Sequence, residues 1–125
     1  MVQLTGQFAR PFRRAALASG RTVRVLAVRR ELDAAETGEL LLTAGTGGGP
    51  MAIQWRRHGR PALALKPPYR LDRVELRGSH RARLYGLTAG VRLVCPDWSP
   101  LFLIAPTQLP LLACAVATSR ATASP

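Results

Sequence analysis

Arginine is the residue type in this sequence with the clearest chemical potential. Eighteen basic residues stand against seven acidic ones, for a formal net charge of +11, and Lys66 is the one lysine. Guanidinium groups bind carboxylates and phosphates through paired hydrogen bonds and stack on aromatic rings. A GC-rich genome would raise arginine content without any function, but such a genome supplies Asp and Glu codons too. The net charge therefore predicts an attraction to polyanions, whatever the origin of the arginines.

The arginines in the middle of the chain are interleaved with Trp55, Tyr69 and Tyr85, a combination suited to phosphate contacts and base stacking. The candidate anion-binding residues are Arg56, Arg57 and Arg60, in one predicted hairpin, and Arg73, Arg77, Arg81, Arg83 and Arg92, which would share one solvent-exposed face if the following strands pair in order. The alternative interpretation is a solvated outer face whose charges keep strand edges from aggregating.

A second basic segment, residues 1–20, is expected to be an arm outside the folded domain. A short amphipathic helix is predicted after Pro11, and Gly20 would end it. The residues that would contact a membrane or a partner are Phe8, Arg10, Phe12, Arg13 and Arg14. Such a helix can lie on an anionic membrane surface. It can equally pack its phenylalanines on the domain, or form a frayed tail.

No catalytic, cofactor or metal site is predicted. His58 and His80 lie in glycine-flanked polar turns, where nothing places a nucleophile or an orienting acid. Cys95 and Cys114 lack the spacing of metal ligands. They are expected to be reduced thiols packed as small apolar residues, the alternative being one bridge between a strand and the C-terminal helix. The glycine run in residues 45–50 lacks the phosphate-loop pattern and predicts a hairpin loop. We therefore expect no small-molecule substrate.

Short alternating apolar runs predict a chain made mainly of β-strands. Strands are expected at residues 23–28, 40–44, 51–56, 62–65, 71–77, 81–87, 91–95 and 101–105. Met51, Ile53 and Trp55 would share one face of their strand, and residues 33–38 would form an acidic turn.

One C-terminal helix is expected, from an N-cap at Thr107 to Thr118. Its buried stripe would be Leu109, Leu112, Ala113 and Val116, which follow the i, i+3, i+4, i+7 spacing of an amphipathic helix. The chain is thus predicted to be a single mainly β (β+α) domain at residues 21–118, with a flexible tail at residues 119–125.

Three passages, taken in order, resemble the pleckstrin-homology (PH)-like superfold, including its bacterial and GRAM-type members and short single-domain proteins of actinobacteria. The first is GELLLT at residues 38–43, and the second is YRLDRVEL at residues 69–76. The third joins GVRLVC at residues 90–95 to LFLIAP at residues 101–106, just before the helix. The resemblance implies a PH-like barrel or sandwich of about seven antiparallel strands capped by one helix, acting as a binding module without enzymatic activity.

In PH domains that bind phosphoinositides, basic residues cluster on the first two strands and on the loop between them. The matching segment here carries four carboxylates, which would repel an inositol phosphate: Glu31, Asp33, Glu36 and Glu39. Arg24, Arg29 and Arg30 compensate only in part, so no phosphoinositide site is expected.

The expected function is docking of a protein partner, or self-association, through a strand edge or the groove of the C-terminal helix. The alternatives are binding of anionic lipid through the N-terminal arm and binding of nucleic acid through the arginine face. The expected location is the cytoplasm, with the inner face of the membrane as a peripheral alternative.

Overall fold

A computed structural model describes residues 21–32, 34–44, 51–75 and 86–123, with side chains in the last helix up to Ser119. Several sequence predictions lie outside these residues. They are the N-terminal arm with its phenylalanines and arginines, the loop at residues 45–50, most of the strand at residues 81–87, and the residues Asp33, Arg77, His80, Arg81 and Arg83.

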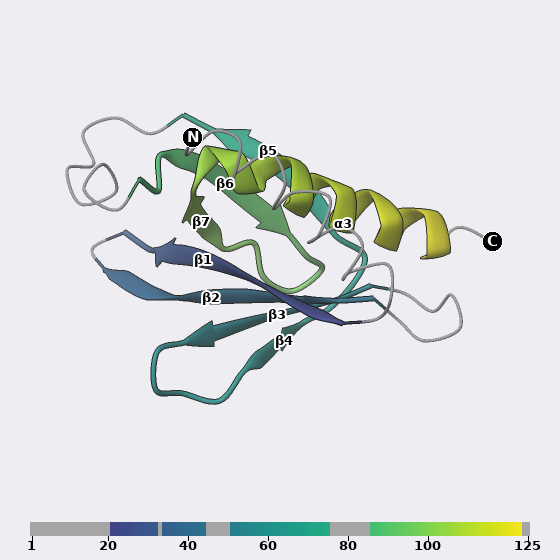
Figure 1. Cartoon of the computed structure of the whole chain (residues 1–125), viewed down its shortest axis with the longest axis horizontal. Helices are drawn as coiled ribbons and strands as arrows, with labels where there is room; N and C mark the ends of the chain where they lie inside the picture. Colours follow the sequence, from purple (N-terminus) through teal and green to yellow (C-terminus); the bar gives the residue numbers. More distant parts are fainter. Residues whose placement is uncertain (1–20, 33, 45–50, 76–85, 124–125) are drawn as a thin grey trace, which may run out of the picture.

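The described strands form one curled antiparallel sheet in the order β4-β3-β2-β1-β7-β6-β5 (Figure 1). They are β1 (Thr22–Arg30), β2 (Ala35–Thr43), β3 (Ala52–Arg57), β4 (Leu63–Leu65), β5 (Arg70–Val74), β6 (Ala89–Val94) and β7 (Leu101–Ile104). The long strand β1 joins the two halves of the sheet, because it pairs along its length with β2 and through its last four residues with β7. The predicted mainly β class is confirmed, and the architecture matches a PH-like β+α fold.

The core fills the hollow side of this sheet. Along β1, Val23, Val25 and Ala27 are buried while the residues between them are exposed, as the two-residue period of a strand requires. Met51, Ile53 and Trp55, predicted to share one face, are all buried on the core side. The Trp55 ring packs against Phe102 of β7, with 5.1 Å between ring centroids. The two halves of the sheet therefore share one hydrophobic core.

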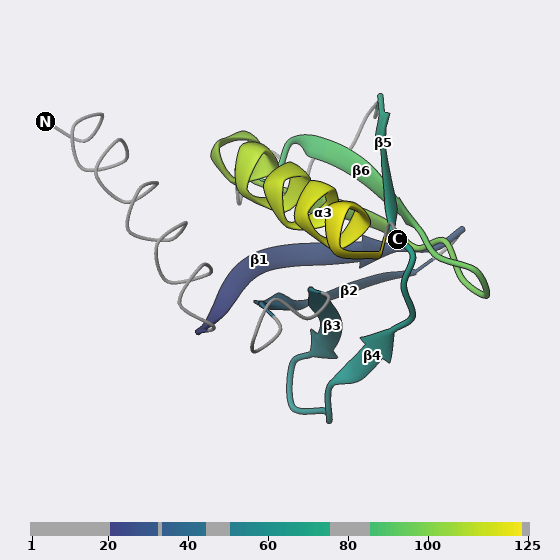
Figure 2. The ribbon, with the colours of Figure 1, turned by 90° about the vertical axis from the view of Figure 1, so that its right-hand side faces the viewer.

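The C-terminal helix α3 (Leu109–Ala123) lies across the hollow of the sheet (Figure 2). It is preceded by a 3₁₀ turn, η2 (Pro106–Gln108), in which Ala105 is the N-cap and no side chain caps the turn. Thr107 therefore lies inside this turn, and its prediction as N-cap is wrong. The helix also continues to Ala123, so residues 119–123 belong to the helix and not to a flexible tail.

The buried stripe of α3 differs from the predicted one. Leu112 and Val116 are buried as expected, but Ala113 is exposed. The other buried positions are Leu111, Ala115 and Ser119. Because nearly every residue from 109 to 117 is apolar, helical spacing alone does not select the face that packs. Contact with the sheet makes that selection.

Strand β2 begins earlier than predicted, so most of the expected acidic turn is strand. The register between β1 and β2 runs unbroken from Thr22 opposite Thr43 to Arg30 opposite Ala35. Between the two strands, the Glu31 N–H donates to the Ala34 carbonyl at 2.8 Å. Continuous pairing with β1 thus overrides the weak strand propensity of alanine and glutamate.

Candidate binding cleft

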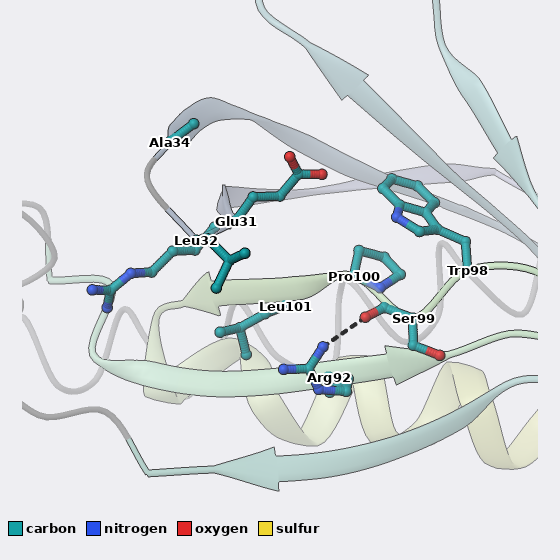
Figure 3. Close-up of a pocket in the computed structure, with 9 residues that line it drawn as sticks. Glu31, Leu32, Ala34, Arg92, Trp98, Ser99, Pro100 and Leu101 are labelled. Carbon is teal, nitrogen blue, oxygen red and sulfur yellow. Dashed lines mark hydrogen bonds between the residues drawn. The ribbon is translucent and has the colours of Figure 1, made fainter.

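A cleft of about 700 Å³ opens between the β1–β2 turn and the segment that joins β6 to β7 (Figure 3). This hairpin-tip cleft is lined by Arg30, Glu31, Leu32, Ala34, Arg92, Trp98, Ser99, Pro100 and Leu101. Its volume lies within the range of about 300–1,000 Å³ typical of ligand sites.

The floor of the cleft consists of side chains that the pairing of three strands places next to one another. Leu101 of β7 is paired on one side with Arg30 of β1 and on the other with Arg92 of β6. Paired residues on neighbouring strands point to the same face of a sheet. The three side chains therefore form one row on the face turned away from α3. With about 4.8 Å between adjacent strands, the backbones of the two arginines are roughly 10 Å apart.

Arg92 is held by a hydrogen bond and has no acidic partner among the described residues. Its Nη1 donates to the Ser99 carbonyl at 2.8 Å, the bond drawn in Figure 3. This bond uses one of the five N–H donors of a guanidinium group. Among the residues that the structure describes, no carboxylate lies within ion-pair distance of Arg92 or Arg30. Asp72, opposite Arg92, is hydrogen-bonded to Arg70 at 3.1 Å through each of its oxygens.

The carboxylates expected to repel anions are paired with arginines wherever the structure describes them. Glu36 accepts from Arg29 Nε at 3.0 Å, from Arg29 Nη2 at 2.6 Å and from Arg57 Nη1 at 2.7 Å. Hydrogen bonds from Arg29 and then Arg57 lower the pKa of Glu36. Glu31 also pairs with Arg29, and Glu39 pairs with Arg56. The negative charge around the β1–β2 turn is thus smaller in effect than the sequence predicts.

The same ion pairs support Trp98 at the wall of the cleft. The guanidinium carbon of Arg29 lies 5.4 Å from the centroid of the Trp98 ring, a cation–π contact. The Arg29 side chain is only 12% exposed and is also paired with Glu31 and Glu36. Across the cleft Leu32 is 100% exposed at the tip of the turn, with Pro100 between the two (Figure 3). The cleft therefore combines a supported aromatic ring with a fully solvated leucine.

The candidate anion-binding arginines that the structure describes, which exclude Arg77, Arg81 and Arg83, do not form one patch. Arg56 and Arg57 are paired with glutamates of β2, and Arg60 is exposed in the β3–β4 turn. Arg92 lies opposite Asp72, whereas Arg73 lies opposite the buried Val91. Successive residues of a strand point to opposite faces. The expectation that Arg73 and Arg92 share a face is therefore wrong.

The residues that sequence reasoning missed are Arg30, Leu32 and Trp98, which come together from two turns distant in the chain. An aromatic residue in a turn between two prolines, as at residues 96–100, was the one local signal available.

Other chemistry is sparse in the described part of the chain. His58 is exposed, and no group of three or more His, Cys, Asp or Glu residues could hold a metal ion there. Cys95 and Cys114 are both free thiols, so the alternative of a bridge is not formed, and burial raises the pKa of the Cys95 thiol. No helix among the described residues has the length and apolar character needed to cross a membrane.

The described part of the chain is thus a mainly β sheet with one C-terminal helix, an architecture that matches a PH-like β+α fold, and it has a surface cleft at one end of the sheet. Comparison of the chain with known protein families, curated proteins and solved structures finds no match.

Proposed function

We propose that this protein is a non-enzymatic PH-like interaction module that docks a protein partner at the hairpin-tip cleft. The observation that carries the proposal is the combination of Leu32, 100% exposed, with the half-buried Trp98 and two arginines that lack a described acidic partner. Aromatic residues and arginine are enriched at protein interfaces, and they dominate the binding energy there.

The cleft suits docking better than the edges of the sheet do. The edge strand β4 has three residues and is bounded by Pro61 and by the Pro67-Pro68 pair. Among the strands that the structure describes, the other outermost one is β5, which carries charged residues in Arg70, Asp72 and Arg73. Short edges bounded by proline or charge are typical of strands protected from pairing with another chain.

Binding of nucleic acid through an arginine face has less support. Two of the candidate arginines, Arg56 and Arg57, already neutralise glutamates, and Arg73 and Arg92 point to opposite faces. A stacking platform for bases also needs exposed rings, whereas Trp55 and Tyr69 are buried in the core. Some of the excess arginines therefore form ion pairs within the domain and are less free to bind nucleic acid.

Site-specific photo-crosslinking in cells tests the proposal. A photoreactive residue at position 32 is compared with one at position 63, because Leu63 is also an exposed leucine, 54% exposed, on strand β4 away from the cleft. We expect protein adducts from position 32, few or none from position 63, and a loss of the adducts in Trp98→Ala. Adducts of the same mass and yield from both positions, or none from position 32, would contradict docking at the cleft.

A further inference from the structure

We infer that the hairpin-tip cleft recognises a peptide segment of the partner in which a carboxylate stands beside a bulky apolar side chain. Arg92 would bind the carboxylate, and Trp98 with Leu32 would cover the apolar group. The inference rests on the proposed function, since it names the chemistry of the segment that docks at the same site.

Arg92 has the properties of an anchor for one carboxylate. Its guanidinium group is already oriented by the Ser99 carbonyl at 2.8 Å, so little side-chain entropy remains to be lost on binding. Its remaining donors can form the paired bonds that guanidinium makes with carboxylate. Arg29, Arg56 and Arg57 differ, because each already holds a glutamate. Arg30 also lacks a described acidic partner, but among the described residues it has no such orienting hydrogen bond.

The apolar part of the ligand follows from the residues next to Arg92. Leu101 is its cross-strand partner, and Pro100 and Trp98 continue the lining from the turn that follows β6. Leu32 faces this surface from the β1–β2 turn (Figure 3). Covering an exposed leucine and an indole ring with an apolar group removes their surface from water, which favours binding. A ligand with charge alone would leave this surface uncovered.

The charges of the protein indicate that the ligand is negative and that it carries few charges. The net charge of +11 attracts an acidic partner and speeds its encounter. However, the Glu31 carboxylate also lines the cleft, although it is paired with Arg29. A nearby carboxylate disfavours a polyanion more than a single negative charge. An acidic and apolar peptide fits both observations.

Selection from peptide libraries tests the inference with the full chain. Two random dodecapeptide libraries are screened, one with a free and one with a blocked C-terminus, which distinguishes a terminal from a side-chain carboxylate. The selected peptides are then synthesised with each Asp or Glu changed to its amide, and also with one phosphoserine in its place. Binding is followed by calorimetry against the wild type, Arg92→Gln and Trp98→Ala. Arg60→Gln is the control, an arginine exposed in the β3–β4 turn.

The expected result is enrichment of peptides with a carboxylate within two residues of Leu, Ile, Phe or Trp. Removing that carboxylate, or changing Arg92 to Gln, should weaken binding at least about tenfold, while Arg60→Gln should leave it nearly unchanged. Arg92→Lys should bind with intermediate strength, because it keeps the charge but loses the paired bonds. Circular dichroism of each variant separates lost binding from lost folding.

Four outcomes would overturn the inference. Suppose that the selected peptides lose binding to Trp98→Ala, but that they bind Arg92→Gln as tightly as the wild type and that their amide versions bind equally well. This would refute recognition of a carboxylate by Arg92 and leave docking at the cleft intact. A phosphoserine version that binds more than about tenfold tighter than the carboxylate would assign the site to phosphate instead. Peptides that bind Trp98→Ala as tightly as the wild type, or no binders from either library, would refute both the inference and the proposed function.

Discussion

Glu36 is the residue whose replacement should test the support of the cleft most clearly. It accepts three hydrogen bonds from two arginines, at 2.6, 2.7 and 3.0 Å, and one of these arginines stacks on Trp98. Glu36→Gln removes the charge and leaves the Arg29 side chain, 12% exposed, with only the more solvated Glu31. A charge-assisted hydrogen bond contributes about 1.5–3 kcal/mol, and partial solvent screening reduces the total here to about 1–3 kcal/mol.

Glu39→Gln is the matched control on the same strand. Glu39 is as exposed as Glu36, at 24% against 23%, but it has one arginine partner, Arg56. The expected loss is about 0–1 kcal/mol, as for most surface ion pairs. Urea denaturation followed by circular dichroism measures both losses. In thermal melts each kcal/mol corresponds to roughly 3–6 °C in Tm for a domain of this size.

The stability difference between wild type and Glu36→Gln should depend on pH. Because the pKa of Glu36 is lowered in the folded state, its stabilising contribution is present above its ordinary value of about 4.3. The contribution is lost as the pH falls through the folded-state pKa. The stability gap between wild type and Glu36→Gln should therefore be widest near neutral pH and should narrow below about pH 4. Equal losses for the two variants, or a gap that stays constant in acid, would refute the reasoning.

Three further perturbations test other parts of the fold. Tyr69→Phe removes a buried hydroxyl that donates to the Leu65 carbonyl at 2.6 Å and accepts from the backbone of β3, and should cost about 1–3 kcal/mol in urea denaturation. Because burial raises the pKa of Tyr69, the wild type should also lose stability above about pH 10, where the tyrosine of the unfolded chain ionises. This alkaline loss should be smaller in Tyr69→Phe. The same alkaline loss in both proteins would contradict the burial of the Tyr69 hydroxyl. Gly38→Ala should cost about 2 kcal/mol or more, because a Cβ would stand 2.2 Å from a carbonyl oxygen of β3, and a near-neutral effect would contradict that packing. In the folded protein a thiol reagent should modify the half-buried Cys114 before the buried Cys95, and a reducing agent should leave Tm unchanged, whereas thiols that appear only after reduction would reveal a bridge.

The pattern of apolar and polar residues along the chain predicted which residues share a face of a strand and where the helix lies. The inward faces of β1 and β3 follow from strict alternation, as with Met51, Ile53 and Trp55. The change from strand to helical pattern near residue 106 is likewise visible in the sequence. The start of β2 was missed because Ala35 and Glu36 favour a strand only through their pairing with β1. Pairing partners of this kind cannot be read from a short window.

The candidate site depended even more on long-range register. Arg57 and Glu36 are 21 residues apart in the chain, so nothing in either segment indicates that they form an ion pair. The same limit applied to Arg73 and Arg92, whose opposite orientations follow from the β5–β6 register. Arginine count alone therefore overestimated the positive surface, because several arginines neutralise nearby glutamates. Trp98 and Leu32 line the same cleft only because two turns distant in the chain lie close together.

The most direct measurement of docking at the hairpin-tip cleft is an amide chemical-shift map of the labelled protein with a partner captured through position 32. We predict that the largest shifts cluster in residues 31–34 and 96–101, together with the indole N–H of Trp98, while that of the buried Trp55 stays in place. Shifts concentrated on the edge strands β4 and β5, or along α3, with the cleft unchanged, would contradict docking at this site.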